Sequence, residues 1–339
     1  MKRPGDYDRN RMPRPKTTPH NSILTQEISA RMFKCDTAFK WLCLASAALI
    51  GILMLGFFVQ LTVSSSEVWR SSGLGFLTSR AWDPVNDEYG ALPSIVGTMV
   101  TTAIALAIAL PLSFSAALFL VDARPLVGEI LGHAIDLLAA IPSVIYGMWG
   151  LFVLAPLMQD HLQPCLIDTL RLDRIPVLGK LLGADYNGFG LLTAGIILGI
   201  MILPYICAIL RDVFQMTPPM LRESAYGIGC TKWETAKDIT LRYGLRGILG
   251  AIFIGLGRAL GETMAVLFVI GNMMDLPENL MAGATTIAST LANNFPEADG
   301  RQRSALFALG LVLLVLSFGI QILAQYYLHA TSARRGEER

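Results

Sequence analysis

The stretch IVGTMVTTAIALAIALPLSFSAALFLV, residues 95–121, contains no charged residue. A helix needs about 20 consecutive apolar residues to cross the hydrocarbon core of a bilayer, so this stretch predicts a transmembrane helix. Five more stretches of similar length are apolar, and only 247–270 carries charges: residues 41–63, 137–158, 187–210, 247–270 and 304–328. The stretch 137–158 is expected to begin earlier, near Ile130. We therefore predict an all-α membrane protein with six transmembrane helices.

The composition agrees with a membrane protein. Hydrophobic residues make up 53% of the 339 residues and charged residues only 16%, against about 25% charged in soluble domains. Six such runs in one chain argue against buried core helices of a soluble protein. A membrane β-barrel would show alternating segments of about ten residues, and none is present. The net charge of +1 gives no reason to expect nucleic acid as a partner.

Lys and Arg residues predict the orientation, because cytoplasmic loops carry an excess of them. With the N-terminus inside, 19 of the 27 fall in cytoplasmic segments, seven fall in outer loops and one, Arg258, lies within a span. Both termini are therefore predicted to be cytoplasmic. The predicted organisation is a polar, disordered cytoplasmic arm (1–40), a first span (41–63), an outer loop (64–94), a core of five spans (95–328) and a cytoplasmic tail (329–339).

The long inner loop, residues 211–246, carries helix signals of its own. Thr217-Pro218 is typical of a helix start, and Gly227 and Gly229 would end that helix. Thr231-Lys232-Trp233-Glu234 has the Ser/Thr-x-x-Glu spacing of a capping box. The sequence thus predicts two short cytoplasmic helices joined at a glycine bend, within residues 213–243.

This loop resembles the "EAA" coupling loop of ABC importer permeases through Glu223-Ser224-Ala225 and Gly229. Ser224 replaces the usual first Ala, and Arg242 stands where Pro is common. The resemblance implies that the loop docks on a separate ATPase subunit. The chain has no GxxxxGK[ST] phosphate-binding loop of its own. The expected coupling residues are Glu223, Ala225, Gly229, Thr231, Trp233 and Glu234.

The fifth span contains a pair of opposite charges. Arg258 and Glu262 are four residues apart, which places them on one face of a helix, and a lone charge there would cost about 2.5–3.5 kcal/mol. They form either an internal ion pair or part of a polar translocation path in which Arg258 meets an oxyanion. Ser143, Thr263 and Asn272 are candidates for the same path or for helix packing. His133 and Asp136, three residues apart, are expected at most to pair with each other; no metal site is expected.

Several segments resemble the permeases of the phosphate-specific (Pst) importers, in particular the C-type subunit. They are GLGRALGETMAV (255–266) with FVIGN (268–272), AWDP (81–84), YGALP (89–93), IPSVIYG (141–147) and TTIASTLAN (285–293). The resemblance implies a type I ABC importer permease fold and a place in the bacterial inner membrane. It also implies a heterodimer with a second, related permease, two copies of a cytoplasmic ATPase, and a periplasmic binding protein that delivers inorganic phosphate.

On this basis the chain is expected to be a non-catalytic subunit that binds no cofactor, ATP and Mg being used by the partner ATPase. Three alternatives remain open: a permease for another oxyanion such as phosphonate or molybdate, a phosphate-sensing scaffold, and a secondary transporter or channel. The last would need no coupling loop and often shows inverted repeats, which the sequence does not contain.

Overall fold

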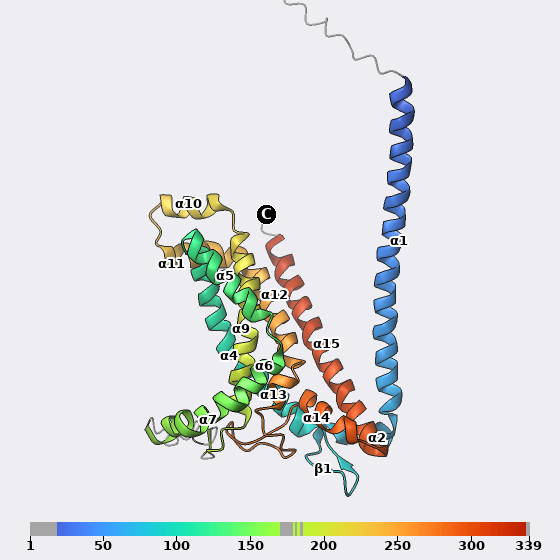
Figure 1. Cartoon of the computed structure of the whole chain (residues 1–339), viewed down its shortest axis with the longest axis vertical. Coiled ribbons are helices and arrows are strands. Elements are labelled where there is room, and N and C mark those ends of the chain that lie inside the picture. The colour runs from blue at the N-terminus through green and yellow to red at the C-terminus, as the bar shows by residue number, and fades with distance from the viewer. Residues whose placement is uncertain (1–18, 170–178, 180–181, 184–185, 337–339) are drawn as a thin grey trace, which may run out of the picture. The chain divides into compact units, whose positions relative to one another are not determined.

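The chain is helical along most of its described length in the computed structural model (Figure 1). The structure describes residues 19–169, 179, 182–183 and 186–336. Residues 1–18 of the predicted arm, 337–339 of the predicted tail and most of the outer stretch 170–185 lie outside the described residues.

Five helical stretches are long and apolar enough to cross a membrane. They are Thr37–Ser64 of α1 (Pro19–Ser64), α4 (Leu92–Asp122), α9 (Leu191–Gln215), Lys232–Leu260, and Gly300–Tyr327 of α15 (Gly300–Gly336). The helical segments Pro125–Ala139 and Ser143–Asp168 meet at 89° and pass the same test together. Counted as one broken span, they bring the total in the described chain to the predicted six.

The first helix begins earlier than the sequence predicts. α1 starts at Pro19, so residues 19–40, expected to belong to a disordered arm, continue the helix of the first span. Neither Gly nor Pro occurs between residues 20 and 50, so the residues that most oppose a helix are missing there. The chain divides into two compact units, residues 1–60 and 61–339, and all that follows concerns the second unit.

The third span is broken rather than straight. The prediction of one helix over residues 137–158 is wrong, because α5 (Pro125–Ala139) ends before Ile141-Pro142 and α6 (Ser143–Trp149) begins after it. Proline has no N–H to donate and disfavours helical backbone in the residue before it. The Tyr146 hydroxyl donates to the Leu138 carbonyl oxygen at 2.9 Å across the bend. After α6 the chain continues through one short α-helix, α7 (Ala155–Leu157), and three π-helical segments: Gly150–Leu154, Met158–Leu162 and Cys165–Thr169.

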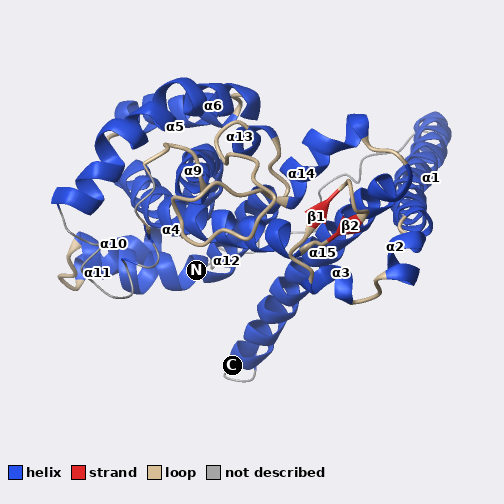
Figure 2. Ribbon diagram, turned by 90° about the horizontal axis from the view of Figure 1, so that it is seen from below, coloured by secondary structure: helices blue, strands red, loops and turns tan. Residues whose placement is uncertain are grey.

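The core is built around α9. More of α9 is buried than of any other candidate span in the described chain, and α4, α5, α12 (Leu241–Leu260) and α13 (Met264–Leu267) pack around it (Figure 2). Small residues let α4 and α9 approach closely: Ala105 and Ala109 are fully buried, and a side chain at Gly195 would collide with Ile104. The Ser113 hydroxyl donates to the Leu203 carbonyl oxygen at 2.8 Å, one residue before the proline within α9.

Between the first two spans lie two short helices, α2 (Ser66–Ser71) and α3 (Gly75–Thr78), and a β-hairpin formed by β1 (Trp82–Asp83) and β2 (Glu88–Tyr89). Asp83 organises the hairpin turn. Its carboxylate accepts from the Asn86 side chain at 2.6 Å and from the Val85 N–H at 2.8 Å. These hydrogen bonds, that from the Asn86 side chain first, hold the pKa of Asp83 below its ordinary value of 3.8.

A buried hydroxyl network joins α4 to the segment that enters α14 (Ile287–Asn294). Thr290, fully buried, hydrogen-bonds through its hydroxyl to Ser94 at 3.0 Å and to Thr285 at 2.7 Å. The Ile287 N–H donates to the Thr98 hydroxyl at 3.0 Å. A Cβ at Gly97 would overlap the Thr285 carbonyl oxygen. This network fixes the irregular chain before α14 against the second span.

Candidate functional site

The helix of the fifth span ends well before Ile270. α12 stops at Leu260 and is followed by Gly261, one further turn in α13, and then irregular chain as far as α14. The prediction of one span over residues 247–270 is therefore wrong beyond Leu260. Glycine has a low helix propensity and is common just after helix ends, which accounts for the end at this position.

Arg258 and Glu262 are not paired across a helical turn. Arg258 lies in the last turn of α12, whereas Glu262 follows the helix end. The Arg258 guanidinium lies over the ring of Tyr205 from α9, with 5.1 Å between its central carbon and the ring centroid. Glu262 Oε1 accepts a hydrogen bond from the Ala265 N–H at 3.2 Å. The prediction that the two charges share one helix face is wrong, because Gly261 ends the helix between them.

The donors of Arg258 remain available. Across the described residues, the recorded ion pairs and hydrogen bonds leave the guanidinium without a partner of either kind, and the side chain is exposed. Irregular backbone at membrane depth is tolerated only where it is buried in protein or lines a water-filled path. An arginine with a free fork of N–H donors beside such a break can bind an oxyanion through two parallel hydrogen bonds.

The other three predicted path residues lie around the same break. Thr263 precedes α13, and its hydroxyl approaches the Gly261 carbonyl oxygen at 3.5 Å. Asn272 has a left-handed backbone, with φ of 53°, and its side chain donates to the Leu267 carbonyl oxygen at 2.9 Å. Its Oδ1 is buried and has no hydrogen-bond partner within the described chain. Ser143 is the first residue of α6.

α6 packs directly on α13, which brings Ser143 into the same neighbourhood. A Cβ at Gly147 would lie 2.9 Å from the Met264 carbonyl oxygen and 3.1 Å from the Ala265 Cα. No recorded hydrogen bond joins any two of the five predicted path side chains in the described part of the chain, so they share a region rather than a network.

Tyr205 is a residue of this region that sequence reasoning missed. It lies in the fourth span, where an aromatic side chain is ordinarily part of helix packing. Its one distinguishing sequence feature is that it follows Pro204 in an otherwise aliphatic run, and this does not identify a partner 53 positions further along the chain.

The coupling loop contains one short helix followed by a long one. α10 (Pro219–Gly227) ends in a turn at Gly229, whose φ is +94°. The predicted capping box is present: the Thr231 hydroxyl accepts from the Glu234 N–H, and the Glu234 carboxylate accepts from the Thr231 N–H at 2.7 Å. It opens α11 (Lys232–Glu234), which continues through a π-helical segment, Thr235–Thr240, into α12.

The prediction of a second short helix is therefore wrong, because helical structure runs from Lys232 to Leu260 without a break. Arg242 explains part of the difference. At the position where the EAA loops commonly have Pro, this chain has a residue that keeps its N–H and forms an i,i+4 ion pair with Asp238 at 3.3 Å. A residue with a backbone N–H does not interrupt a helix as Pro does.

The loop presents apolar and charged side chains outward. Glu223 is exposed, Ala225 is buried within the loop, and Trp233 and Ile228 are 66% and 84% exposed. Exposed large apolar side chains among charges are typical of a surface that binds another protein. Arg222 of α10 forms an ion pair with Asp122, the last residue of α4, which ties this surface to the core.

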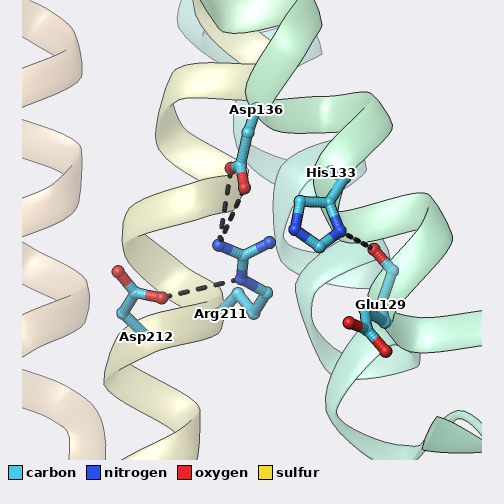
Figure 3. A network of polar contacts seen from close by, with 5 residues as sticks. All are labelled: Glu129, His133, Asp136, Arg211 and Asp212. Atoms are coloured by element: carbon cyan, nitrogen blue, oxygen red, sulfur yellow. Dashed lines mark hydrogen bonds and ion pairs between the residues drawn. The ribbon is translucent and has the colours of Figure 1, made fainter. Parts of the chain in front are cut away.

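A second polar cluster joins α5 to the C-terminal part of α9 (Figure 3). Arg211 forms ion pairs with Asp136 at 3.4 Å and with Asp212 at 3.6 Å. His133 Nδ1 lies 2.8 Å from the Glu129 carbonyl oxygen. Within the described part of the chain, His133 and Asp136 do not form the pair that their spacing allowed. The cluster lines a cavity of about 510 Å³.

Comparison with known proteins places the chain in a family. Residues 109–332 match the model of the binding-protein-dependent transport system inner membrane component. A phosphate transport system permease protein PstC from Haemophilus influenzae is 44% identical over 303 residues, covering 89% of this chain and 96% of that protein. The PstC of Mesorhizobium japonicum is 47% identical, covering 89% of this chain and 92% of that protein.

A solved structure shares the fold. A chain of a bacterial alginate ABC transporter, in complex with an alginate pentasaccharide-bound periplasmic protein, has a TM-score of 0.58 at 16% identity. The likeness covers 86% of this chain and 95% of that chain. The predicted ABC importer permease fold is thus confirmed.

Proposed function

The chain belongs to the PstC family of phosphate transport system permeases, within the binding-protein-dependent inner membrane components, and on that premise we propose that it forms part of the path by which inorganic phosphate crosses the inner membrane. One observation supports this most: Arg258 stands at a break in a membrane-spanning helix with its hydrogen-bond donors unused. Phosphate is an oxyanion that a guanidinium binds through two hydrogen bonds.

The path would use Arg258 as its anion-binding residue, with Thr263, Asn272 and Ser143 along the same wall. Conduction requires a site that attracts the anion and still releases it. A single exposed arginine, held by an aromatic ring rather than enclosed by several cations, meets both needs. Glu262 would shape the backbone of the break by accepting from Ala265, and would tune the local field only secondarily.

The energy for transport would enter through the coupling loop. Helical structure continues from the capping box at Thr231 to Arg258, so a push on the loop can move the arginine with little bending between them. Glu223, Trp233 and Glu234 lie on the exposed part of the loop. The chain carries no nucleotide-binding loop of its own, so ATP and Mg would be bound by the partner, and this chain would hold no cofactor.

The assembly we propose contains this chain, a second related permease, two copies of a cytoplasmic ATPase and a periplasmic phosphate-binding protein. The chain would span the inner membrane several times with both termini in the cytoplasm, in line with the distribution of Lys and Arg. A permease for phosphonate or molybdate, or a phosphate-sensing scaffold, would share this architecture but differ in what it carries.

The test is phosphate uptake by vesicles that contain the full complex. Arg258→Ala should abolish uptake, whereas Arg246→Ala, at an exposed arginine on the same helix, should leave it intact. Glu223→Lys should abolish uptake and also release the ATPase from the membrane. Normal phosphate uptake by the Arg258→Ala complex would exclude Arg258 from the path. Uptake of molybdate or phosphonate in preference to phosphate would make the chain a permease for that oxyanion. A complex that transports none of the three yet alters phosphate-dependent signalling would be a scaffold.

A further inference from the structure

Tyr205 and Arg258 come from different helices and meet at the helix break. Tyr205 lies on α9 and Arg258 in the last turn of α12, and the guanidinium carbon is 5.1 Å from the centroid of the ring. A cation within about 6 Å of a ring centroid is attracted by the negative face of the ring. A contact with a ring face occupies none of the five N–H donors of an arginine, and the ion pairs and hydrogen bonds of the described residues leave those of Arg258 without an acceptor.

A carboxylate partner would act differently. In a bidentate pair with Asp or Glu, an arginine spends two of its donors on the partner and loses much of its net charge. The nearest acidic residue in sequence, Glu262, instead accepts from a backbone N–H. The structure thus orients Arg258 by the one kind of contact that neither neutralises it nor occupies its donors.

The backbone that carries the Tyr205 ring is held in place by the packing of α9 against α12. Ile206, the neighbour of Tyr205, is fully buried, and a Cβ at Gly255 would lie 2.6 Å from its Cδ1. α9 and α12 therefore touch one residue beyond Tyr205 and three residues before Arg258. Pro204, also buried, restricts the backbone on the other side of Tyr205. Together these contacts fix how far the ring stands from the end of α12.

We infer that Tyr205 is a positioning residue for phosphate transport, which holds the Arg258 guanidinium in place through its ring face and so keeps its donors directed at the passing anion. This rests on the proposed function, since it requires Arg258 to meet phosphate. The ring face, rather than the hydroxyl, carries the effect.

The test replaces Tyr205 by phenylalanine and by mono-, di- and trifluorinated phenylalanines in the full complex. Fluorine withdraws charge from the ring face with little change of size, so folding and packing are preserved. Phosphate turnover should be near that of the native complex for Tyr205→Phe and fall stepwise with each fluorine, to about twofold to fivefold lower, as expected for an exposed cation on a ring face. ATP hydrolysis should fall less than uptake, so that more ATP is spent per phosphate.

The outcomes separate this inference from the function on which it rests. If turnover is the same for all four rings while Arg258→Ala abolishes uptake, the inference is overturned and the proposed function stands. If Arg258→Ala transports phosphate normally, both fail. A fall for Tyr205→Phe as large as for its fluorinated forms would assign the effect to the hydroxyl and would also overturn the inference.

Discussion

Arg222 of the coupling helix α10 forms an ion pair with Asp122, the last residue of the second span, across 100 positions of sequence. The pair joins the surface expected to meet the ATPase to the helix that packs most extensively on α9. It therefore offers a route from the loop to the core that is separate from the continuous helix leading to Arg258.

Breaking the Arg222–Asp122 ion pair should weaken the coupling of ATP hydrolysis to phosphate uptake. Partly exposed ion pairs are worth about 0.2–1 kcal/mol, so Asp122→Arg, which adds repulsion to the loss, should reduce phosphate uptake by about twofold to fivefold while ATP hydrolysis persists. The exchange Asp122→Arg with Arg222→Asp should restore uptake. A double variant no better than the single one would show that the pair does not transmit the movement.

Glu262 should be needed as a hydrogen-bond acceptor and not as a charge. Because its Oε1 accepts from the Ala265 N–H and no ion pair with Arg258 is recorded among the described residues, Glu262→Gln should keep most of the phosphate uptake. Glu262→Ala should lose several-fold more, since the turn of α13 would lose its acceptor. Equal losses in both variants, measured as uptake per assembled complex, would favour a role for the negative charge.

Gly97→Ala should destabilise the packing of α4 against the segment that enters α14. The added methyl would overlap the backbone oxygen of Thr285, which cannot move without disturbing the buried hydroxyl network. Overpacking of this kind costs about 1–3 kcal/mol, so the thermal midpoint of the purified complex should fall. Gly250→Ala is the matched control, because nothing lies within 4 Å of its added Cβ, and it should keep or raise the midpoint, since Ala favours a helix interior over Gly.

The β-hairpin turn should loosen at acid pH. The pKa of Asp83 is lowered below 3.8 in the folded chain by its hydrogen bonds to Asn86 and Val85. A depressed pKa contributes stability above the unfolded value, and this is lost as pH falls through the folded one. Hydrogen exchange at the Val85 and Asn86 amides, corrected for the intrinsic rate, should therefore be slow at pH 5 and faster below about pH 3.8. Asp83→Asn should remove this pH dependence.

Two cysteines report the predicted orientation. Cys165, exposed on the stretch after α7, and Cys230, in the coupling loop, are both free thiols. In single-cysteine variants of intact cells, a membrane-impermeant maleimide should label Cys165 directly through the periplasm. It should label Cys230 only after the inner membrane is permeabilised. The reverse pattern would invert the topology and exclude the coupling loop from contact with a cytoplasmic ATPase.

The sequence predicts those features whose cause is local. Six apolar runs imply six spans because the cost of a charged side chain in lipid depends on local composition, and because a helix pairs its own backbone groups within the run. The capping box at Thr231 and Glu234 could be recognised because both of its hydrogen bonds lie within four residues. The break at Ile141-Pro142 is different, because α4 and α9 each continue through a proline, Pro111 and Pro204, so a proline alone does not predict where a span breaks.

Where the fifth span ends depends on more than local propensity. α12 contains five glycines and continues through all of them, yet it stops at Gly261: Gly244, Gly247, Gly250, Gly255 and Gly257. The same residue type thus ends the helix in one place and not in the others, so glycine propensity alone does not locate the helix end. The spacing of Arg258 and Glu262 implies a pair only if the helix goes on.

From the sequence alone, then, come the membrane-spanning helices, the capped loop between α9 and the fifth span, and the prediction that Arg258 belongs to the path. What the tertiary structure decided is the partner of each charged group: Tyr205 for Arg258, Ala265 for Glu262, and Asp122 for Arg222. A membrane span depends on the summed hydropathy of consecutive residues, whereas the partner of a charged side chain depends on the distance between helices. That distance is set by small residues such as Gly255, whose effect becomes visible only when the two helices are packed together.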